Sequence, residues 1–108
     1  MNIAVIDLGT NTFNLLIASV EGQSFESKYV TKEFVRLGQG GINSKIIQPD
    51  AFARGFNTLA QFKRKATSMA CDQIICIATS AVRNAENGGE FAAKAKKELG
   101  LKIQVIDG

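Results

Sequence analysis

The residues best suited to chemistry form a short polar segment, "DLGTNT" at positions 7–12, which stands between two apolar runs. A tight turn between antiparallel strands presents successive backbone N–H groups outward, and such a concavity binds anions. Gly9 would let the backbone approach a phosphoryl oxygen closely. The next three residues, Thr10, Asn11 and Thr12, would add hydroxyl and amide donors. The segment therefore predicts a phosphate-binding turn.

The acidic residue of this segment, Asp7, would repel a phosphate unless a cation lay between them. Its carboxylate therefore suits a water-mediated Mg²⁺ or the orientation of a water molecule. The alternative is structural, because Asp, Gly, Asn and Thr are common turn formers and a hairpin could use them for geometry alone. The sequence has no Walker pattern, and "GQGG" at 38–41 does not open a helix as a dinucleotide fingerprint would.

A second polar segment, "ATSAVRNAEN" at 78–87, leaves the end of a buried strand and enters a helix. Ligands of open α/β sheets bind at such strand ends. Thr79 and Ser80 offer hydroxyl groups there, and Arg83 offers a planar guanidinium that matches phosphate oxygens. An ordinary surface position is an equally good interpretation of Arg83 from the residues alone.

Seven elements are expected to position these residues, in the order strand, strand, strand, helix, strand, helix, strand. Buried or alternating apolar runs predict the strands at 3–7, 13–20, 25–35, 73–78 and 101–106. One helix is expected to begin at Pro49 and the other near Asn87. Three strands in hairpin succession followed by strand–helix alternation predict an α/β fold with a mixed sheet and helices on its faces.

Each expected helix carries signals beyond its periodicity. Gly55 interrupts the first helix, which indicates that the backbone packs closely against something there. In the second helix, the Asn87 side chain is expected to act as the cap, with Glu90 completing a capping box, and Gly100 ends the helix. The expected inner faces are formed by Phe52, Phe56, Leu59, Phe62, Ala66 and Met69 in the first helix, and by Phe91, Ala95 and Leu99 in the second.

Composition excludes several classes of protein. The chain has 108 residues and a formal net charge of +3, which is too weak to argue for nucleic acid on its own. Basic residues cluster at 63–65 and 94–102, where they could steer a polyanion, although solvated helix faces explain them better. With two cysteines and no histidine, a zinc site is not expected, and Cys71 and Cys76 are predicted to be buried reduced thiols of a cytoplasmic protein. The sequence shows neither a signal peptide nor an apolar run of about 20 residues.

Four stretches together resemble the exopolyphosphatase / guanosine pentaphosphate phosphohydrolase family, Ppx/GppA. These are "AVIDLGTNTFNLLIA" (4–18), "VRLGQG" (35–40), "ARGFNTLAQF" (53–62) and "ATSAVRNAENGGEF" (78–91). The first stretch is shared more loosely with actin-like ATPases, sugar kinases and heat-shock chaperones, whereas the last is more specific to the phosphatases. The resemblance implies a ribonuclease H-like half of an actin-like ATPase fold, with the active site in a cleft between two domains.

The resemblance also implies roles for the polar residues. "DLGTNT" corresponds to the first phosphate-binding loop of the family, and Arg83 to an arginine that faces the substrate phosphate. The family removes terminal phosphate from polyphosphate, or the 5′-γ-phosphate from guanosine pentaphosphate, with a divalent metal, for which we expect Mg²⁺. A non-hydrolytic actin-like module that binds a nucleotide or phosphate is the alternative from another class. We expect no nucleic-acid or membrane partner and keep open a homodimer of the full-length protein.

One departure from the family concerns the last residues. In the family, the strand matching 103–106 leads into a Ser-Gly segment and paired glutamates, one of which is the general base. Here Asp107-Gly108 stands in that place, and neither the glutamates nor the second phosphate loop is in the sequence. We therefore expect residues 1–108 to be the N-terminal actin-like subdomain of a longer two-domain phosphatase, and to be inactive alone.

Overall fold

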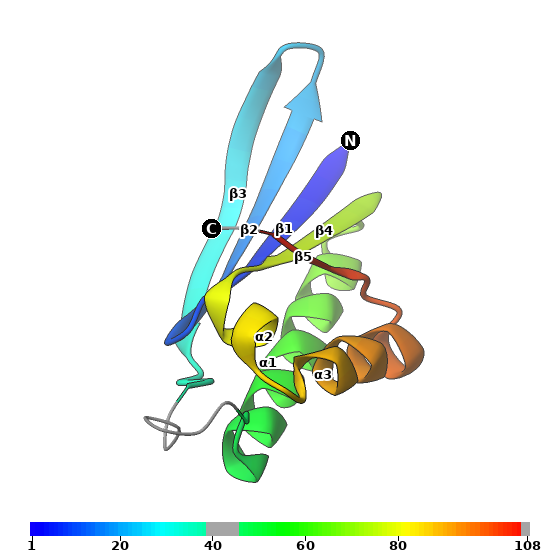
Figure 1. The fold of residues 1–108 in the computed structure, drawn as a ribbon. Helices are drawn as coiled ribbons and strands as arrows, with labels where there is room; N and C mark the ends of the chain where they lie inside the picture. Colours follow the sequence, from blue (N-terminus) through cyan, green and yellow to red (C-terminus); the bar gives the residue numbers. More distant parts are fainter. Residues whose placement is uncertain (39–45, 107–108) are drawn as a thin grey trace.

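The computed structural model describes residues 1–38 and 46–106, which build one mixed sheet with helices packed against it (Figure 1). The sheet has five strands in the order β3-β2-β1-β4-β5. In chain order the elements are β1 (Asn2–Leu8), β2 (Thr12–Glu21), β3 (Ser24–Phe34), α1 (Pro49–Ser68), β4 (Gln73–Ala78), α2 (Ser80–Asn84), α3 (Gly88–Lys94), the π-helical turn η1 (Ala95–Leu99) and β5 (Ile103–Val105). The glycine-rich loop expected at 36–44 lies largely outside the described residues, as do Asp107 and Gly108.

The first three strands form an antiparallel meander, as the alternation of their residues predicts. β1 pairs with β2 from Asn2↔Ser19 to Leu8↔Phe13, and β2 pairs with β3 along its whole length. Gly22, with φ of 60°, supplies the left-handed residue of the turn between β2 and β3. On the other side of β1, β4 runs parallel to it, and β5 runs parallel to β4. The expected mixed sheet is therefore confirmed.

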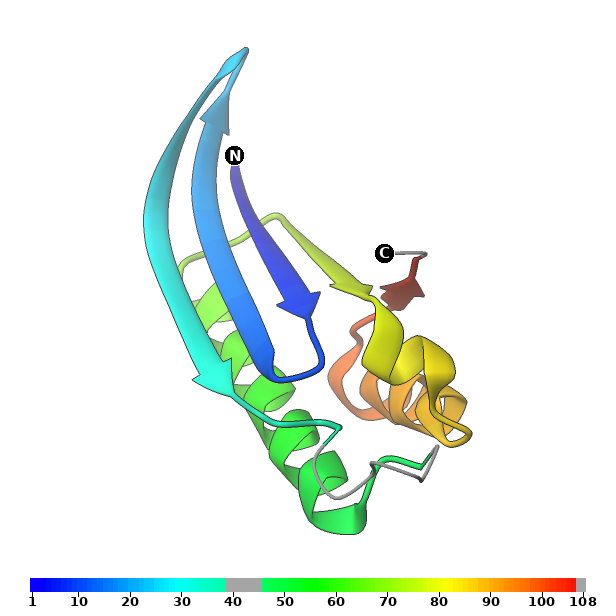
Figure 2. The same ribbon diagram turned by 60° about the vertical axis from the view of Figure 1, so that its left-hand side comes forward.

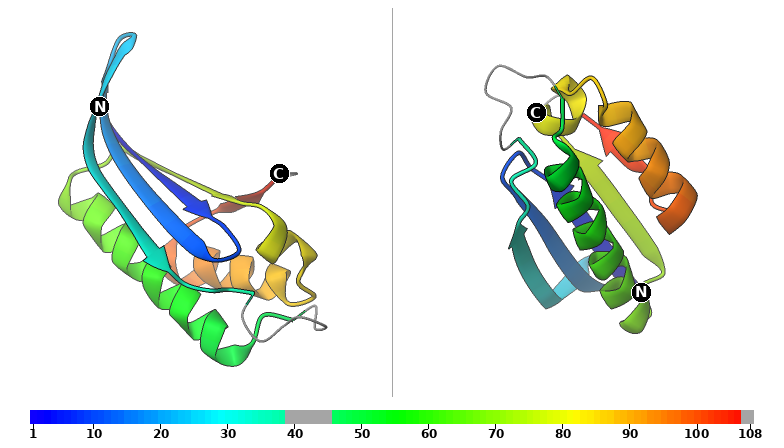
Figure 3. Two further views of the ribbon diagram at one scale, coloured as in Figure 1. Left: turned by 90° about the vertical axis from the view of Figure 1, so that its left-hand side faces the viewer. Right: turned by 90° about the horizontal axis from the view of Figure 1, so that it is seen from below.

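All described helices cover one face of the sheet (Figure 3). Alternate residues of β1, such as Ile6 and Leu8, point into this layer and are buried, whereas Asp7 is exposed on the opposite face. The core between the layers joins the strands to α1 through Leu59 and Phe62. No helix among residues 1–38 and 46–106 combines the length and hydrophobicity that crossing a bilayer requires.

Gly55 lies at the point where α1 approaches both the segment after β3 and α3. A Cβ atom added there would stand 3.1 Å from Leu37 Cδ1 and 3.1 Å from Phe91 Cζ. Such distances are tighter than ordinary van der Waals contact, so the Leu37 and Phe91 side chains would have to shift to admit a Cβ atom there. The expected close approach at this glycine is confirmed.

The chain between β4 and β5 differs from the single helix that the sequence predicts. It contains α2, α3 and η1 in succession, and β5 is three residues long instead of six. Asn87 does precede α3, but its side chain makes no capping hydrogen bond. Instead, Asn87 Oδ1 accepts a hydrogen bond from the Ile47 N–H at 2.8 Å, and Asn87 Nδ2 donates to the Ile47 carbonyl at 3.0 Å. The predicted capping box is therefore wrong, because the Asn87 side chain hydrogen-bonds to the segment before α1 instead of to the start of α3.

The two cysteines are free thiols, as expected. Cys76 is buried in β4, whereas Cys71 is half-buried, so the prediction of burial holds fully for Cys76 alone. Burial, together with the negative charge of Asp7, raises the pKa of the Cys76 thiol to about 12. Cys76 therefore stays protonated at neutral pH and packs as a small apolar residue.

Candidate functional site

The two polar segments meet at one end of the sheet. Because β1 and β4 are parallel neighbours, their carboxyl ends reach the same edge, where Leu8 pairs with Ala78. The Thr79 N–H donates a hydrogen bond of 3.4 Å to the Leu8 carbonyl, directly before the β1–β2 turn. Figure 2 shows this turn and the start of α2 at the same end of the sheet. The structure therefore brings residues 9–12 next to Thr79.

The β1–β2 turn is closed by one internal hydrogen bond. The Gly9 N–H donates to the Thr12 carbonyl at 2.9 Å, and a Cβ on Gly9 would stand 3.0 Å from that oxygen. Gly9 therefore shapes the turn, and its own amide hydrogen is used inside it. At the tip of the turn, Thr10 and Asn11 are exposed, while Thr12 is half-buried. An anion would accordingly meet the tip residues rather than the Gly9 amide.

The segment after β3 contacts the β1–β2 turn, and the sequence did not predict this contact. The Arg36 N–H donates to the Asn11 carbonyl at 2.8 Å, and the Gly38 N–H donates to the Thr10 carbonyl at 3.3 Å. A Cβ on Gly38 would stand 3.1 Å from Thr10 Cγ2, so the glycine permits this approach. The glycines of this stretch are a sequence signal of a close contact, but they do not indicate which residues lie on the other side of it.

Asp7 is the carboxylate closest to the turn along the chain, and it lies on the face of the sheet that the described helices leave open. Its cross-strand neighbour on β2 is Asn14, and its neighbour on β4 is Ile77. Among the described residues, no group of three or more His, Cys, Asp or Glu could hold a metal ion. Mg²⁺ characteristically uses one or two carboxylates and completes its shell with water and substrate phosphate. One carboxylate beside the turn that the sequence predicts to bind phosphate fits that mode.

Arg83 lies in α2, and its backbone N–H donates to the Thr79 carbonyl at 3.1 Å. Its guanidinium Nη1 donates to the carbonyl of Ile106, beyond β5, at 3.0 Å. β5 lies two strands from β1, which is about 10 Å across the sheet. Arg83 and the turn thus lie at the same end of the sheet, with the guanidinium hydrogen-bonded to the chain beyond β5. Ser80 begins α2, and its side chain lies outside the described part.

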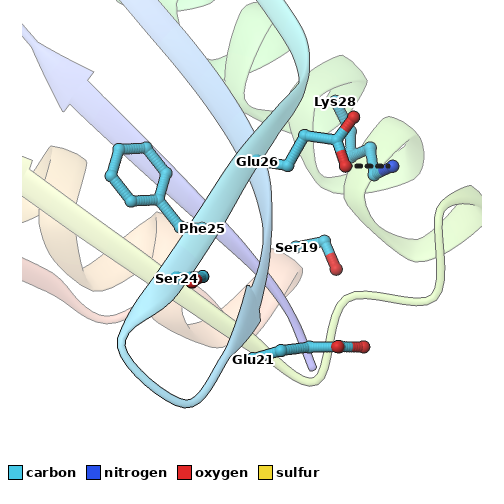
Figure 4. Close-up of a pocket in the computed structure, with 6 residues that line it drawn as sticks. All are labelled: Ser19, Glu21, Ser24, Phe25, Glu26 and Lys28. Carbon is cyan, nitrogen blue, oxygen red and sulfur yellow. Dashed lines mark hydrogen bonds and ion pairs between the residues drawn. The ribbon is translucent and has the colours of Figure 1, made fainter.

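A pocket at the other end of the molecule does not suit an anion. It lies at the tip of the β2–β3 hairpin, about 30 Å of strand away from the turn. Its charged residues are Glu21, Glu26 and Lys28, and the ammonium of Lys28 lies 3.1 Å from Glu26 (Figure 4). The two carboxylates outnumber the one cation, so a phosphate would be repelled.

With this geometry in place, comparison with known families decides what the chain is. The Ppx/GppA phosphatase family matches residues 16–108. The chain belongs to this family. The Ppx/GppA chain is 37% identical to an exopolyphosphatase from Cytophaga hutchinsonii over its whole length, with a TM-score of 0.95. It is 26% identical to the Ppx/GppA family member of Aquifex aeolicus over 99% of its length, with a TM-score of 0.94. The chain spans 35% of each of these two proteins.

More distant structures share the fold alone. Thermus thermophilus RuvC is 11% identical with a TM-score of 0.56, and the ethanolamine utilization protein EutJ from Carboxydothermus hydrogenoformans is 12% identical with a TM-score of 0.50. Together with the Ppx/GppA structures, they confirm the expected fold class, a ribonuclease H-like half of an actin-like ATPase fold.

Proposed function

We propose that the full-length protein carrying this Ppx/GppA chain is an exopolyphosphatase, which hydrolyses the terminal phosphoanhydride bond of inorganic polyphosphate. The observation that carries the proposal is the 37% identity to an exopolyphosphatase in a match that covers the whole chain. The juxtaposition of that turn with Thr79 supports it, because a phosphate needs several donors converging from different loops.

The roles follow from the positions of the residues. The exposed tip of the turn, Thr10 and Asn11, would hold oxygens of the terminal phosphate, with the Thr79 hydroxyl beside it. Asp7 would hold Mg²⁺ through water, and the bound ion would supply positive charge against the phosphate oxygens. Arg83 would leave the Ile106 carbonyl and turn its guanidinium toward the charge that develops on the bridging oxygen. A chain of phosphates could span the turn and Arg83, which lie on different elements at the same end of the sheet.

The test is phosphate release by the full-length protein from polyphosphate, guanosine pentaphosphate and ATP, each with Mg²⁺ and with EDTA. We expect polyphosphate to give the highest kcat/KM and EDTA to abolish turnover. Arg83→Ala should lower kcat by about 100-fold, as loss of one transition-state donor does. Arg64→Ala is the matched control, because Arg64 is exposed on α1.

Each other outcome has a defined meaning. A higher kcat/KM for guanosine pentaphosphate than for polyphosphate would change the proposed substrate, but the protein would still be a phosphoanhydride hydrolase. Binding of phosphate without turnover on any of the three substrates would favour a non-hydrolytic module and overturn the proposal. Activity of Arg83→Ala equal to that of Arg64→Ala would remove Arg83 from the site. The isolated 108-residue chain should release no phosphate above a control without protein, because the glutamate that the family uses as base is not in it.

A further inference from the structure

Arg54 of α1 reaches across to the segment that follows β3. Its Nε donates to the Val35 carbonyl at 2.8 Å, and its Nη2 donates to the Arg36 carbonyl at 3.3 Å. The side chain is half-buried, and its Nη1 also lies 3.5 Å from Asp50 one turn earlier on the helix. One guanidinium thus holds two successive peptide carbonyls, which only the planar fork of an arginine does well.

The same segment in turn holds the tip of the β1–β2 turn through the Arg36 and Gly38 amides. Figure 2 shows it passing between this turn and α1. Arg36 has a φ of 53°, in the left-handed region that a non-glycine residue adopts at a cost of about 1–2 kcal/mol. Such a conformation persists only where its surroundings impose it, and the Arg54 contacts on the two carbonyls are part of those surroundings.

The orientation of the carbonyls sets the orientation of the amides. The described chain has no cis peptide bond, so each N–H points opposite to the carbonyl of the same peptide unit. With the Thr10 carbonyl turned toward Gly38, the Asn11 N–H points away from the segment after β3. The Asn11 carbonyl, turned toward Arg36, directs the Thr12 N–H away in the same manner. If either carbonyl faced the anion instead, its dipole would repel the phosphate.

We propose that Arg54 is a positioning residue for the phosphate-binding turn, acting through a brace formed by Val35, Arg36 and Gly38. This inference rests on the proposed function for the identity of the ligand, whereas the hydrogen bonds of the brace are observed in the structure. Arg54 acts through this brace rather than on the substrate. It keeps the tip carbonyls turned away, so that the amides of the turn are preorganised before phosphate arrives.

The test compares three variants of the full-length protein. Arg54→Ala removes the two hydrogen bonds that hold the brace. Asp50→Asn removes the negative charge that pairs with Arg54, and Arg64→Ala removes another arginine of α1. Inorganic phosphate is titrated by calorimetry, and the backbone order parameter of the Asn11 N–H is measured by ¹⁵N relaxation. We expect Arg54→Ala to weaken phosphate binding about tenfold and to lower the Asn11 order parameter from about 0.85 to below about 0.6. Asp50→Asn and Arg64→Ala should match the wild type in both.

Arg54→Lys covers the case in which Arg54→Ala does not fold. Lysine keeps the charge and the stem but offers a point donor, so it should hold one carbonyl and weaken phosphate binding about threefold. Unchanged phosphate affinity and order parameter in both Arg54 variants would overturn the brace and leave the hydrolase proposal intact. If the wild type neither binds phosphate nor hydrolyses polyphosphate, the proposed function fails. The Asn11 order parameter then decides the brace alone, with an unchanged value counting against it.

Discussion

Substituting Asn87 separates two roles that one residue could have at the start of α3. The structure assigns it two hydrogen bonds to the backbone of Ile47, at 2.8 and 3.0 Å, and both are partly buried. Each is worth about 0.5–1.5 kcal/mol net, so Asn87→Ala should lower the free energy of unfolding by about 2 kcal/mol. Asn87→Asp keeps the acceptor for the Ile47 N–H but places a carboxylate oxygen against the Ile47 carbonyl. We expect it to cost about 2 kcal/mol as well.

A helix cap would behave differently toward aspartate. Asp and Asn cap helices equally well, and a negative charge at a helix N-terminus is favourable. If Asn87 were a helix cap, Asn87→Asp would therefore leave the free energy of unfolding unchanged or raise it. The assay is urea denaturation of the full-length protein, with Glu90→Ala as the control for the second member of the capping box. Glu90 is exposed, and its substitution should change stability by less than about 0.5 kcal/mol. Wild-type stability of Asn87→Asp would refute the assignment to Ile47.

Two further predictions concern stability. A Cβ on Gly88 would stand 2.0 Å from the Val82 carbonyl oxygen, whereas one on Gly89 would meet nothing within 4 Å. Gly88→Ala should therefore cost more than about 3 kcal/mol, while Gly89→Ala should stabilise the helix by up to about 1 kcal/mol, both measured by urea denaturation. The pKa of Cys76, raised to about 12, predicts that folded protein keeps a proton that the unfolded chain releases above about pH 9. Between pH 9 and 11, the wild type should lose about 1.4 kcal/mol per pH unit more than Cys76→Ala, and parallel curves would contradict this.

The meander and α1 could be predicted because their signals are local. The alternation of apolar and polar residues, as at Ile6 and Asp7, indicates which face of a strand is buried. Pro49 marks the first turn of α1, and the helix begins at this residue. The five residues of α2 are too few to show a period, so the sequence predicted one helix where three helical pieces follow one another.

The meeting of the two polar segments could be predicted from the sequence, whereas the contacts that support them could not. Gly9 and Thr79 could be placed together because the carboxyl ends of neighbouring parallel strands meet at one edge. Arg54, Arg83 and Asn87 instead bond to backbone groups distant in the sequence. Every residue has a backbone carbonyl, so the sequence does not indicate which carbonyl a given side chain will bond to. Only the folded chain supplies that information.

The parallel pairing of β1 with β4 has a consequence for the order of events in folding. Leu8 and Ala78, whose pairing creates the edge, are roughly seventy residues apart in the chain. The meander of β1, β2 and β3 needs only local contacts and can close first, but at that stage Thr79 is still remote from the turn. A ligand that spans both therefore binds the completed domain and no partly folded form. Its binding energy adds wholly to the resistance of the native state against unfolding.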